Sequence, residues 1–166
     1  MNISRFLTED LIRLEMTTDI EPLEEGNNTD RWRQEGKERI LDELVGLLES
    51  GYRTGNRTKL LLDFINREKK ATTALGDGIA VPHIRSKQAK EFMIAFARSS
   101  EGYDFDSPDG KPVHLFVIMA APPYDDTLYL RVFKSLAGML QYESFRNELM
   151  AAGHPGELLR AIRAME

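Results

Sequence analysis

The stretch that decides the fold is Val113–Ala121, which reads VHLFVIMAA and is almost entirely apolar. Phe92–Ala97 is a second near-continuous apolar run, and the connector between them, DFDSPDGKP, carries the turn-forming pair Asp109-Gly110 near its tip. Runs that are apolar on both faces are typical of strands in a sheet that helices cover on both sides. The sequence therefore predicts two buried strands joined by a turn-rich connector.

Segments with the apolar spacing of amphipathic helices lie on either side of these strands. Thr127–Gln141 shows the pattern most strongly, because eight of its positions that repeat at helical intervals are apolar. The other predicted helices are Lys37–Ser50, Thr58–Arg67, Glu143–Ala152 and Gly156–Met165. Helices on both sides of a small central sheet predict an α/β sandwich.

The chain of 166 residues has a length typical of one domain, and no linker is long enough to divide it. We therefore expect a single domain over residues 1–166. Residues 19–36, DIEPLEEGNNTDRWRQEG, are polar and contain Pro22, Gly26 and Asn27-Asn28. This composition predicts a surface loop, inserted before the first helix.

Composition excludes several classes of protein. The chain has no cysteine, which excludes disulfides, thiolate metal sites and cysteine nucleophiles and fits a reducing compartment. Its 22 basic and 27 acidic residues give a net charge of −5, and no basic patch predicts a nucleic-acid partner. No apolar run approaches the ~20 residues of a membrane span, and the first residues lack a signal-peptide core. We expect a cytoplasmic protein without direct membrane insertion.

Motifs for metals and cofactors are also missing from the sequence. The GDG at 76–78 is too short for a nucleotide-binding loop, and no His-Glu-x-x-His or Gly-x-Ser-x-Gly occurs. We therefore expect neither a cofactor nor a metal.

Three histidines remain as candidates for chemistry. His154 lies in a turn between a glycine and a proline, and His114 begins an apolar strand, where a packed neutral ring is the usual role. His83 directly follows a short apolar run and Pro82, so it lies at the end of a predicted strand. Ligands bind at strand ends in open α/β sheets, which makes His83 the first candidate, although a packing role stays open.

The residues around His83 resemble a known family. Arg67–Arg85, REKKATTALGDGIAVPHIR, is similar to the signature of the fructose/mannitol-type enzyme IIA domains of the bacterial sugar phosphotransferase system, which include the nitrogen-regulatory enzyme IIA proteins. Glu101–Pro123 resembles the hairpin and strand that follow in that family, and Leu128–Ala152 resembles its next helix pair. The resemblance extends from about Ile40 to the C-terminus.

The resemblance implies a fold and an activity. The fold is a small central mixed β-sheet flanked by helices on both faces. The activity is that of a phosphotransferase component, a phosphohistidine carrier that needs no cofactor. The donor would be HPr or nitrogen-type HPr, and the acceptor a cysteine of an enzyme IIB domain. In the nitrogen-type proteins, the phosphorylation state would instead control a regulated protein.

The same resemblance assigns roles to individual residues. His83 matches the phosphorylated histidine, and Arg67 matches the arginine that holds the phosphoryl group. Thr73 occupies the motif threonine and would help to bind phosphate, unless it is simply a β-branched residue at a strand start. Arg85 is a second candidate for phosphate binding, although a solvated loop arginine is its simpler role. A guanidinium suits this task because its forked donors match phosphate oxygens.

Two positions depart from the family pattern. Ile84 stands where the family usually has glycine after the histidine, which adds an apolar wall beside the site. Tyr129 stands where the family usually has a second histidine, and we expect its hydroxyl to hydrogen-bond to His83 or to its phosphoryl group, although a packing role stays open. The loss of that histidine keeps open the alternative of an interaction module that is not phosphorylated. The choice between sugar transport and regulation also stays open, as does the identity of the sugar.

Overall fold

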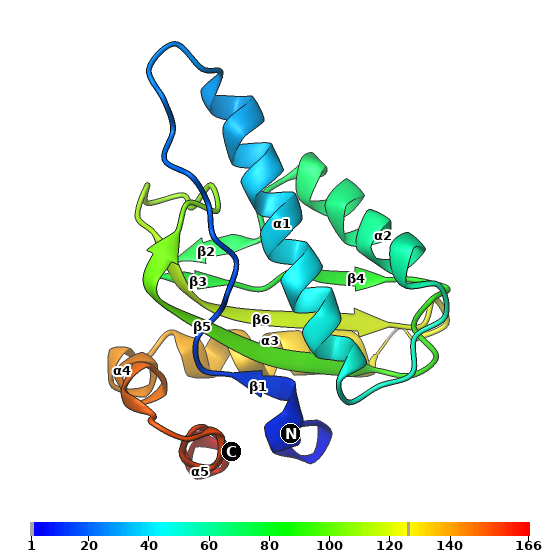
Figure 1. Cartoon of the computed structure of the whole chain (residues 1–166). Coiled ribbons are helices and arrows are strands. Elements are labelled where there is room, and N and C mark those ends of the chain that lie inside the picture. The colour runs from blue at the N-terminus through cyan, green and yellow to red at the C-terminus, as the bar shows by residue number, and fades with distance from the viewer. Residues whose placement is uncertain (1, 126) are drawn as a thin grey trace.

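The computed structural model describes residues 2–125 and 127–166. In this part of the chain, six strands form one sheet between two layers of helices (Figure 1). The strand order is β1-β5-β6-β3-β2, and β4 also pairs with β6. β6 (Val113–Ala121) therefore lies at the centre of the sheet, and all but one of its nine residues are buried. The predicted α/β fold with a small mixed sheet is confirmed.

β5 (Met93–Tyr103) and β6 form the antiparallel pair at the middle of the sheet, with Ile94 opposite Met119. Gly110 in the connector has a φ of +71°, a conformation that glycine adopts without strain. β5 is longer than the apolar run Phe92–Ala97 predicts. Its second half is polar and partly exposed, and its register with β6 shifts between Arg98 and Tyr103.

The short strands give the sheet its mixed character. β3 (Ile79–Ala80) and β4 (His83–Arg85) both run parallel to β6 and are separated by Val81 and Pro82. Pro82 has no N–H to donate, but its carbonyl accepts a hydrogen bond from Met119 N at 2.9 Å. The chain thus follows β6 through the interruption. β2 (Ala74–Gly76) pairs antiparallel with β3, and β1 (Ile12–Arg13) pairs parallel with β5.

Helices cover both faces of the sheet, as Figure 1 shows. α1 (Thr29–Glu49) and α2 (Arg57–Lys70) lie on one face. The helices of the other face are α3 (Leu128–Leu140), α4 (Glu143–Ala151) and α5 (Pro155–Met165). Two 3-10 helices near the N-terminus, η1 (Ile3–Phe6) and η2 (Glu9–Leu11), contact α5.

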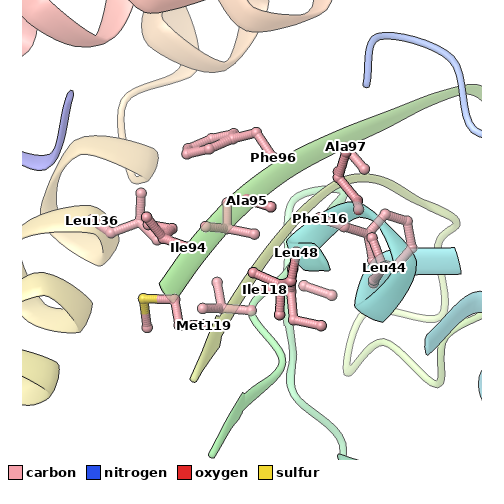
Figure 2. Packing of buried hydrophobic residues seen from close by; sticks show 14 of the residues in the cluster. Leu44, Leu48, Ile94, Ala95, Phe96, Ala97, Phe116, Ile118, Met119 and Leu136 are labelled. Carbon is pink, nitrogen blue, oxygen red and sulfur yellow. The ribbon is translucent and has the colours of Figure 1, made fainter. Parts of the chain in front are cut away.

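The core consists of two layers because neighbouring residues of each central strand point to opposite faces. Figure 2 shows Ile94 beside Leu136 of α3, whereas Phe116 and Ile118 lie on the side of α1, near Leu44 and Leu48. These residues are fully buried. The continuous apolar runs of the sequence therefore fill both layers at once.

The prediction of a loop over residues 19–36 is wrong in its second half, because α1 begins at Thr29. Asn28 caps this helix by accepting a hydrogen bond from Arg31 N at 3.0 Å. Arg31 pairs with Glu35 one turn later. The first two turns are thus helical through polar contacts, which apolar spacing does not detect.

The prediction of a single domain over residues 1–166 includes Met1 and Asp126, which lie outside the described residues. Among the residues that are described, no helix combines the length and the apolar character needed to cross a bilayer.

Candidate functional site

A cavity of about 840 Å³ opens beside the C-terminal end of β6, between α2 and α3. It brings together four of the residues singled out in the sequence, namely Arg67, His83, Ile84 and Tyr129. Arg85 lines it as well. These residues come from three separate elements, α2, β4 and α3, so the cavity exists because the sheet brings their ends together.

The protonation of the His83 ring is fixed by the backbone. The Nδ1 atom lies 2.6 Å from the carbonyl oxygen of Val81. Because a carbonyl oxygen can only accept a hydrogen bond, Nδ1 carries the proton and Nε2 keeps its lone pair. The ring is half-buried and packs against Phe133, with 4.7 Å between the ring centres, and against Tyr129 at 5.8 Å.

The surroundings favour the neutral form of this ring. Burial lowers the pKa of His83 below its usual value of 6.5, and the Arg67 charge lowers it further. The hydrogen bond to Val81 and the carboxylate of Glu68 act in the opposite direction but do not outweigh the lowering of the pKa. His83 is therefore a neutral imidazole near pH 7, with a nucleophilic Nε2.

Arg67 lies in the last turn of α2 and is half-buried. Its Nη1 atom donates a hydrogen bond to the carbonyl oxygen of Ala71 at 2.9 Å, just beyond the end of the helix. This contact anchors one arm of the guanidinium and leaves its other donors for an anion in the cavity.

Thr73 does not line the cavity. Its side chain is buried, and its hydroxyl donates to Glu68 Oε1 at 2.5 Å, while its backbone N–H donates to Glu68 Oε2 at 2.7 Å. A hydroxyl has one proton, and in Thr73 that proton is already donated. The interpretation of Thr73 as a phosphate ligand is therefore corrected. The structure instead places Thr73 in a group of polar contacts that supports α2.

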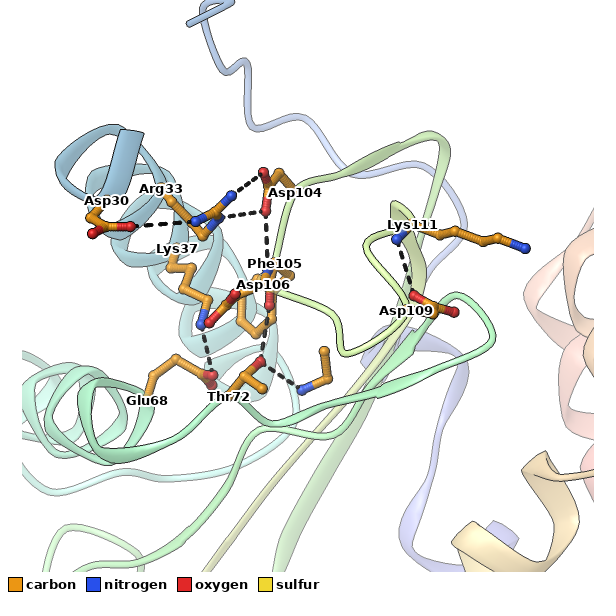
Figure 3. A network of polar contacts seen from close by, with 11 residues as sticks. Asp30, Arg33, Lys37, Glu68, Thr72, Asp104, Phe105, Asp106, Asp109 and Lys111 are labelled. Carbon is orange, nitrogen blue, oxygen red and sulfur yellow. Dashed lines mark hydrogen bonds and ion pairs between the residues drawn. The ribbon is translucent and has the colours of Figure 1, made fainter. Parts of the chain in front are cut away.

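This support is a buried polar network between α1, α2 and the connector before β6. Lys37 of α1 donates to Glu68 Oε2 at 3.1 Å, and both side chains are almost fully buried. The Lys37 Nζ atom also lies 4.9 Å from the centre of the Phe105 ring. Figure 3 shows the pair beside a second link, in which the Thr72 hydroxyl donates to the Phe105 carbonyl. The network ties the C-terminal turn of α2, which carries Arg67, to the rest of the fold.

Tyr129 is buried at the edge of the cavity, and the Arg85 guanidinium carbon lies 5.5 Å from the centre of its ring. Burial raises the pKa of Tyr129 above 10, although the charges of Arg67 and Arg85 act against this, so the hydroxyl stays protonated. Among the hydrogen bonds of residues 2–125 and 127–166, none joins Tyr129 to His83. The two rings pack instead, and the phenol can still donate to an anion in the cavity.

Ile84 is buried and faces Ala120 across β4 and β6. The other two histidines lie elsewhere in the fold. His114 Nδ1 bonds to the Ser99 carbonyl at 3.0 Å, at the opposite end of β6. His154 Nδ1 caps α5 by accepting from Gly156 N at 2.9 Å. In the described part of the chain, no group of three or more acidic or histidine side chains is arranged to hold a metal.

Sequence reasoning missed several side chains at this cavity. Phe133 packs on His83 and follows Tyr129 by four residues, so helical spacing was an available signal for it. Lys59 and Lys70 line the cavity together with Arg67, and their spacing of eight and three residues along α2 also places them on one helix face. Lys87, which also lines the cavity, had no such signal.

Comparison with known proteins shows that most of the chain matches one protein family. Residues 28–165 match the family described as phosphoenolpyruvate-dependent sugar phosphotransferase system, EIIA 2. The chain is 34% identical over 116 residues to the fructose-specific EIIA component of Haloferax volcanii. The aligned residues cover 70% of this chain and 75% of that protein. The fructose-specific EIIABC component of Bacillus subtilis is also 34% identical over 116 residues, but the chain spans 18% of its length.

A solved structure is similar over nearly the whole chain. It is the nitrogen regulatory protein IIA-Ntr from Neisseria meningitidis, with 30% identity and a TM-score of 0.79. The alignment covers 96% of this chain and 98% of that one.

Proposed function

Since the chain belongs to the EIIA 2 family of the phosphoenolpyruvate-dependent sugar phosphotransferase system, we propose that it carries a phosphoryl group on Nε2 of His83. The observation that carries this proposal is the 2.6 Å contact between Nδ1 and the Val81 carbonyl. It leaves Nε2 as the nucleophilic nitrogen of a neutral ring at the edge of an open cavity.

The transfer needs no proton from the solvent. The Nε2 lone pair forms the new N–P bond while the donor's bond to phosphorus breaks, and that electron pair stays on the donor atom. The proton stays on Nδ1, which keeps donating its hydrogen bond to the Val81 carbonyl oxygen throughout. Arg67 neutralises the charge on the phosphoryl oxygens and thereby holds the phosphorus in line between Nε2 and the donor atom. The Tyr129 hydroxyl supplies a neutral donor, and Ile84 with Phe133 limits access of water.

The partners follow from the family. The donor is an HPr-type carrier, either HPr or its nitrogen-type relative, and the acceptor is a cysteine of an enzyme IIB domain. The name of the Bacillus relative, EIIABC, joins an A component to B and C components in one chain. The likeness to IIA-Ntr over 96% of the chain favours a second use of the same chemistry, in which the phosphorylation state controls binding to a regulated protein.

The test is labelling with phosphoenolpyruvate in the presence of enzyme I and an HPr-type carrier. We expect one acid-labile phosphoryl group per chain, which His83→Ala abolishes, and a phosphorus NMR signal typical of Nε2-phosphohistidine. His154→Ala is the matched control, because that residue caps α5 far from the cavity, and it should be labelled as the wild type is. Labelling that survives in His83→Ala would refute the assignment. A wild type that no donor labels would favour the alternative of an interaction module that is not phosphorylated.

A further inference from the structure

The cavity beside His83 concentrates positive charge in a chain that is acidic overall. Its lining includes five basic side chains, namely Lys59, Arg67, Lys70, Arg85 and Lys87. Among the described residues that line it, one is acidic, Asp63, and its carboxylate accepts a hydrogen bond from Ser86 Oγ at 2.6 Å. The whole chain, in contrast, has 27 acidic and 22 basic residues. Positive charge is thus concentrated around this cavity.

These five cations have no acidic partners in the described part of the chain. Elsewhere on the surface, arginines such as Arg31 and Arg57 pair with carboxylates of the same chain. None of the ion pairs formed by residues 2–125 and 127–166 involves the five cations of the cavity. Four of the five side chains, all except that of Arg67, are exposed. Clustered like charges repel one another, so this arrangement is suited to an anionic partner.

A single phosphoryl group does not match this charge. A phosphorylated side chain carries about −1.5 to −2 at pH 7. The five basic residues and one acidic residue of the lining leave a formal excess of four positive charges. About two positive charges therefore remain unmatched after His83 is phosphorylated, and they lie on the rim where another protein must approach.

One exposed apolar side chain lines the cavity, and two others are sequence neighbours of lining residues. Leu62 lines the cavity and is 51% exposed, and Leu130, next to Tyr129 in α3, is 53% exposed. Tyr124 follows the cavity residue Pro123 and is 81% exposed. Exposed apolar groups beside a charged rim are typical of a protein-binding surface.

We infer that the protein that docks here to exchange the phosphoryl group surrounds its own reactive residue with acidic side chains. This inference rests on the proposed function of His83 and adds the chemistry of the partner. The acidic surface pairs with Lys59, Lys70, Arg85 and Lys87, while apolar residues of the partner contact Leu62, Tyr124 and Leu130. Opposite charges on the two surfaces accelerate encounter, and this acceleration is lost in high salt.

The experiment uses one HPr-type carrier in two forms, with glutamates or with lysines at four exposed positions around its phosphorylated residue. We expect the glutamate form to phosphorylate the full chain about tenfold faster than the lysine form at low ionic strength, and less than about twofold faster in 0.5 M salt. The double variant Lys59→Glu/Lys87→Glu should reverse this preference. Lys111→Glu, which makes one Lys→Glu change outside the cavity, before the start of β6, is the control and should keep it.

Equal rates from both carriers, or a faster lysine form, would overturn the inference while leaving phosphorylation of His83 in place. A second measurement does not depend on phosphoryl transfer. An octaglutamate peptide should shift the backbone amide signals of Arg85 and Lys87 at low salt, and an octalysine peptide should not. Absence of these shifts also counts against the inference. If neither carrier nor phosphoramidate labels His83, the proposed function fails, and the peptide titration decides the docking chemistry alone.

Discussion

At the scale of single residues, the site depends on which nitrogen of His83 bears the proton. The Val81 carbonyl fixes that proton on Nδ1, and burial keeps the ring neutral. In the proposed reaction, Arg67 then has two effects, and both favour phosphoryl transfer. Its charge lowers the pKa of the ring, which preserves the nucleophile, and its donors attract the phosphoryl oxygens.

Arg67→Lys separates charge from geometry. The variant keeps the positive charge but loses the planar fork and the anchoring bond to Ala71. We expect phosphoryl transfer to His83 to slow by about ten- to a hundredfold, with little change in the urea midpoint of unfolding. Arg85→Lys is the comparison, because Arg85 lies on the ring of Tyr129. A larger loss from Arg85→Lys would transfer the phosphate-binding role to that residue.

Tyr129 offers a donor but no positive charge. We expect Tyr129→Phe to shorten the lifetime of phospho-His83 by about ten- to a hundredfold at most, since one hydrogen bond to a charged group contributes about 1.5–3 kcal/mol. Tyr129→His should lengthen it, because a protonated ring adds a charge beside the phosphoryl group. Following the decay of the phosphoryl label in each variant checks both expectations. Identical lifetimes in all three proteins would show that Tyr129 only packs against His83.

At the scale of elements, the buried pair Lys37–Glu68 connects α1 to the turn that carries Arg67. Glu68→Gln leaves the Lys37 ammonium buried without a counter-charge, so we expect a loss of about 3–5 kcal/mol in the free energy of unfolding. Lys37→Met/Glu68→Gln removes both charges and should recover much of that loss. Urea denaturation of the three proteins provides the measurement. A double variant as unstable as Glu68→Gln would contradict this account.

The helices and strands also show what the sequence could predict. α3, α4 and α5 match the predicted segments within one residue at each end, because each has a clear apolar face. The start of α1 was missed because it depends on a cap at Asn28 and on Arg33, which bonds to Asp104, 71 residues away. The placement of Thr73 was missed for a different reason, because its partner Glu68 lies only five residues away. No local sequence pattern predicts that the Thr73 hydroxyl donates a hydrogen bond to Glu68.

At the scale of the whole molecule, the segment before α1 is attached through Glu43. Its carboxylate accepts bonds from Arg13, Thr17 and Thr18. Burial alone would raise the pKa of Glu43, but the hydrogen bonds from Thr18, Thr17 and Arg13 outweigh it and lower the pKa from 4.5 to about 2. One carboxylate therefore links the N-terminal segment to the helical layer.

These pKa values predict how stability depends on pH. Glu43 is more acidic in the folded chain, so its contribution is present above about pH 4.5 and is lost as the pH falls toward 2. His83 has a lowered pKa, so the unfolded chain binds that proton first and stability declines as the pH falls through 6.5. We expect urea midpoints to fall in two steps on acidification. Glu43→Gln should reduce the lower step, to which Asp104 and Asp109 also contribute because their pKa values are lowered too, and an unchanged lower step in that variant would contradict the assignment.

The burial of β6 has a consequence for the chain before it folds. In the native sheet, almost every residue of this strand is hidden, but a newly made chain exposes VHLFVIMAA, an uncharged segment with a strong tendency to form intermolecular sheets. Pro112 precedes the strand and Pro122-Pro123 follow it, and proline cannot extend such a ladder. The prolines that delimit β6 therefore also act as gatekeepers against aggregation, at the moment when the molecule is most exposed to it.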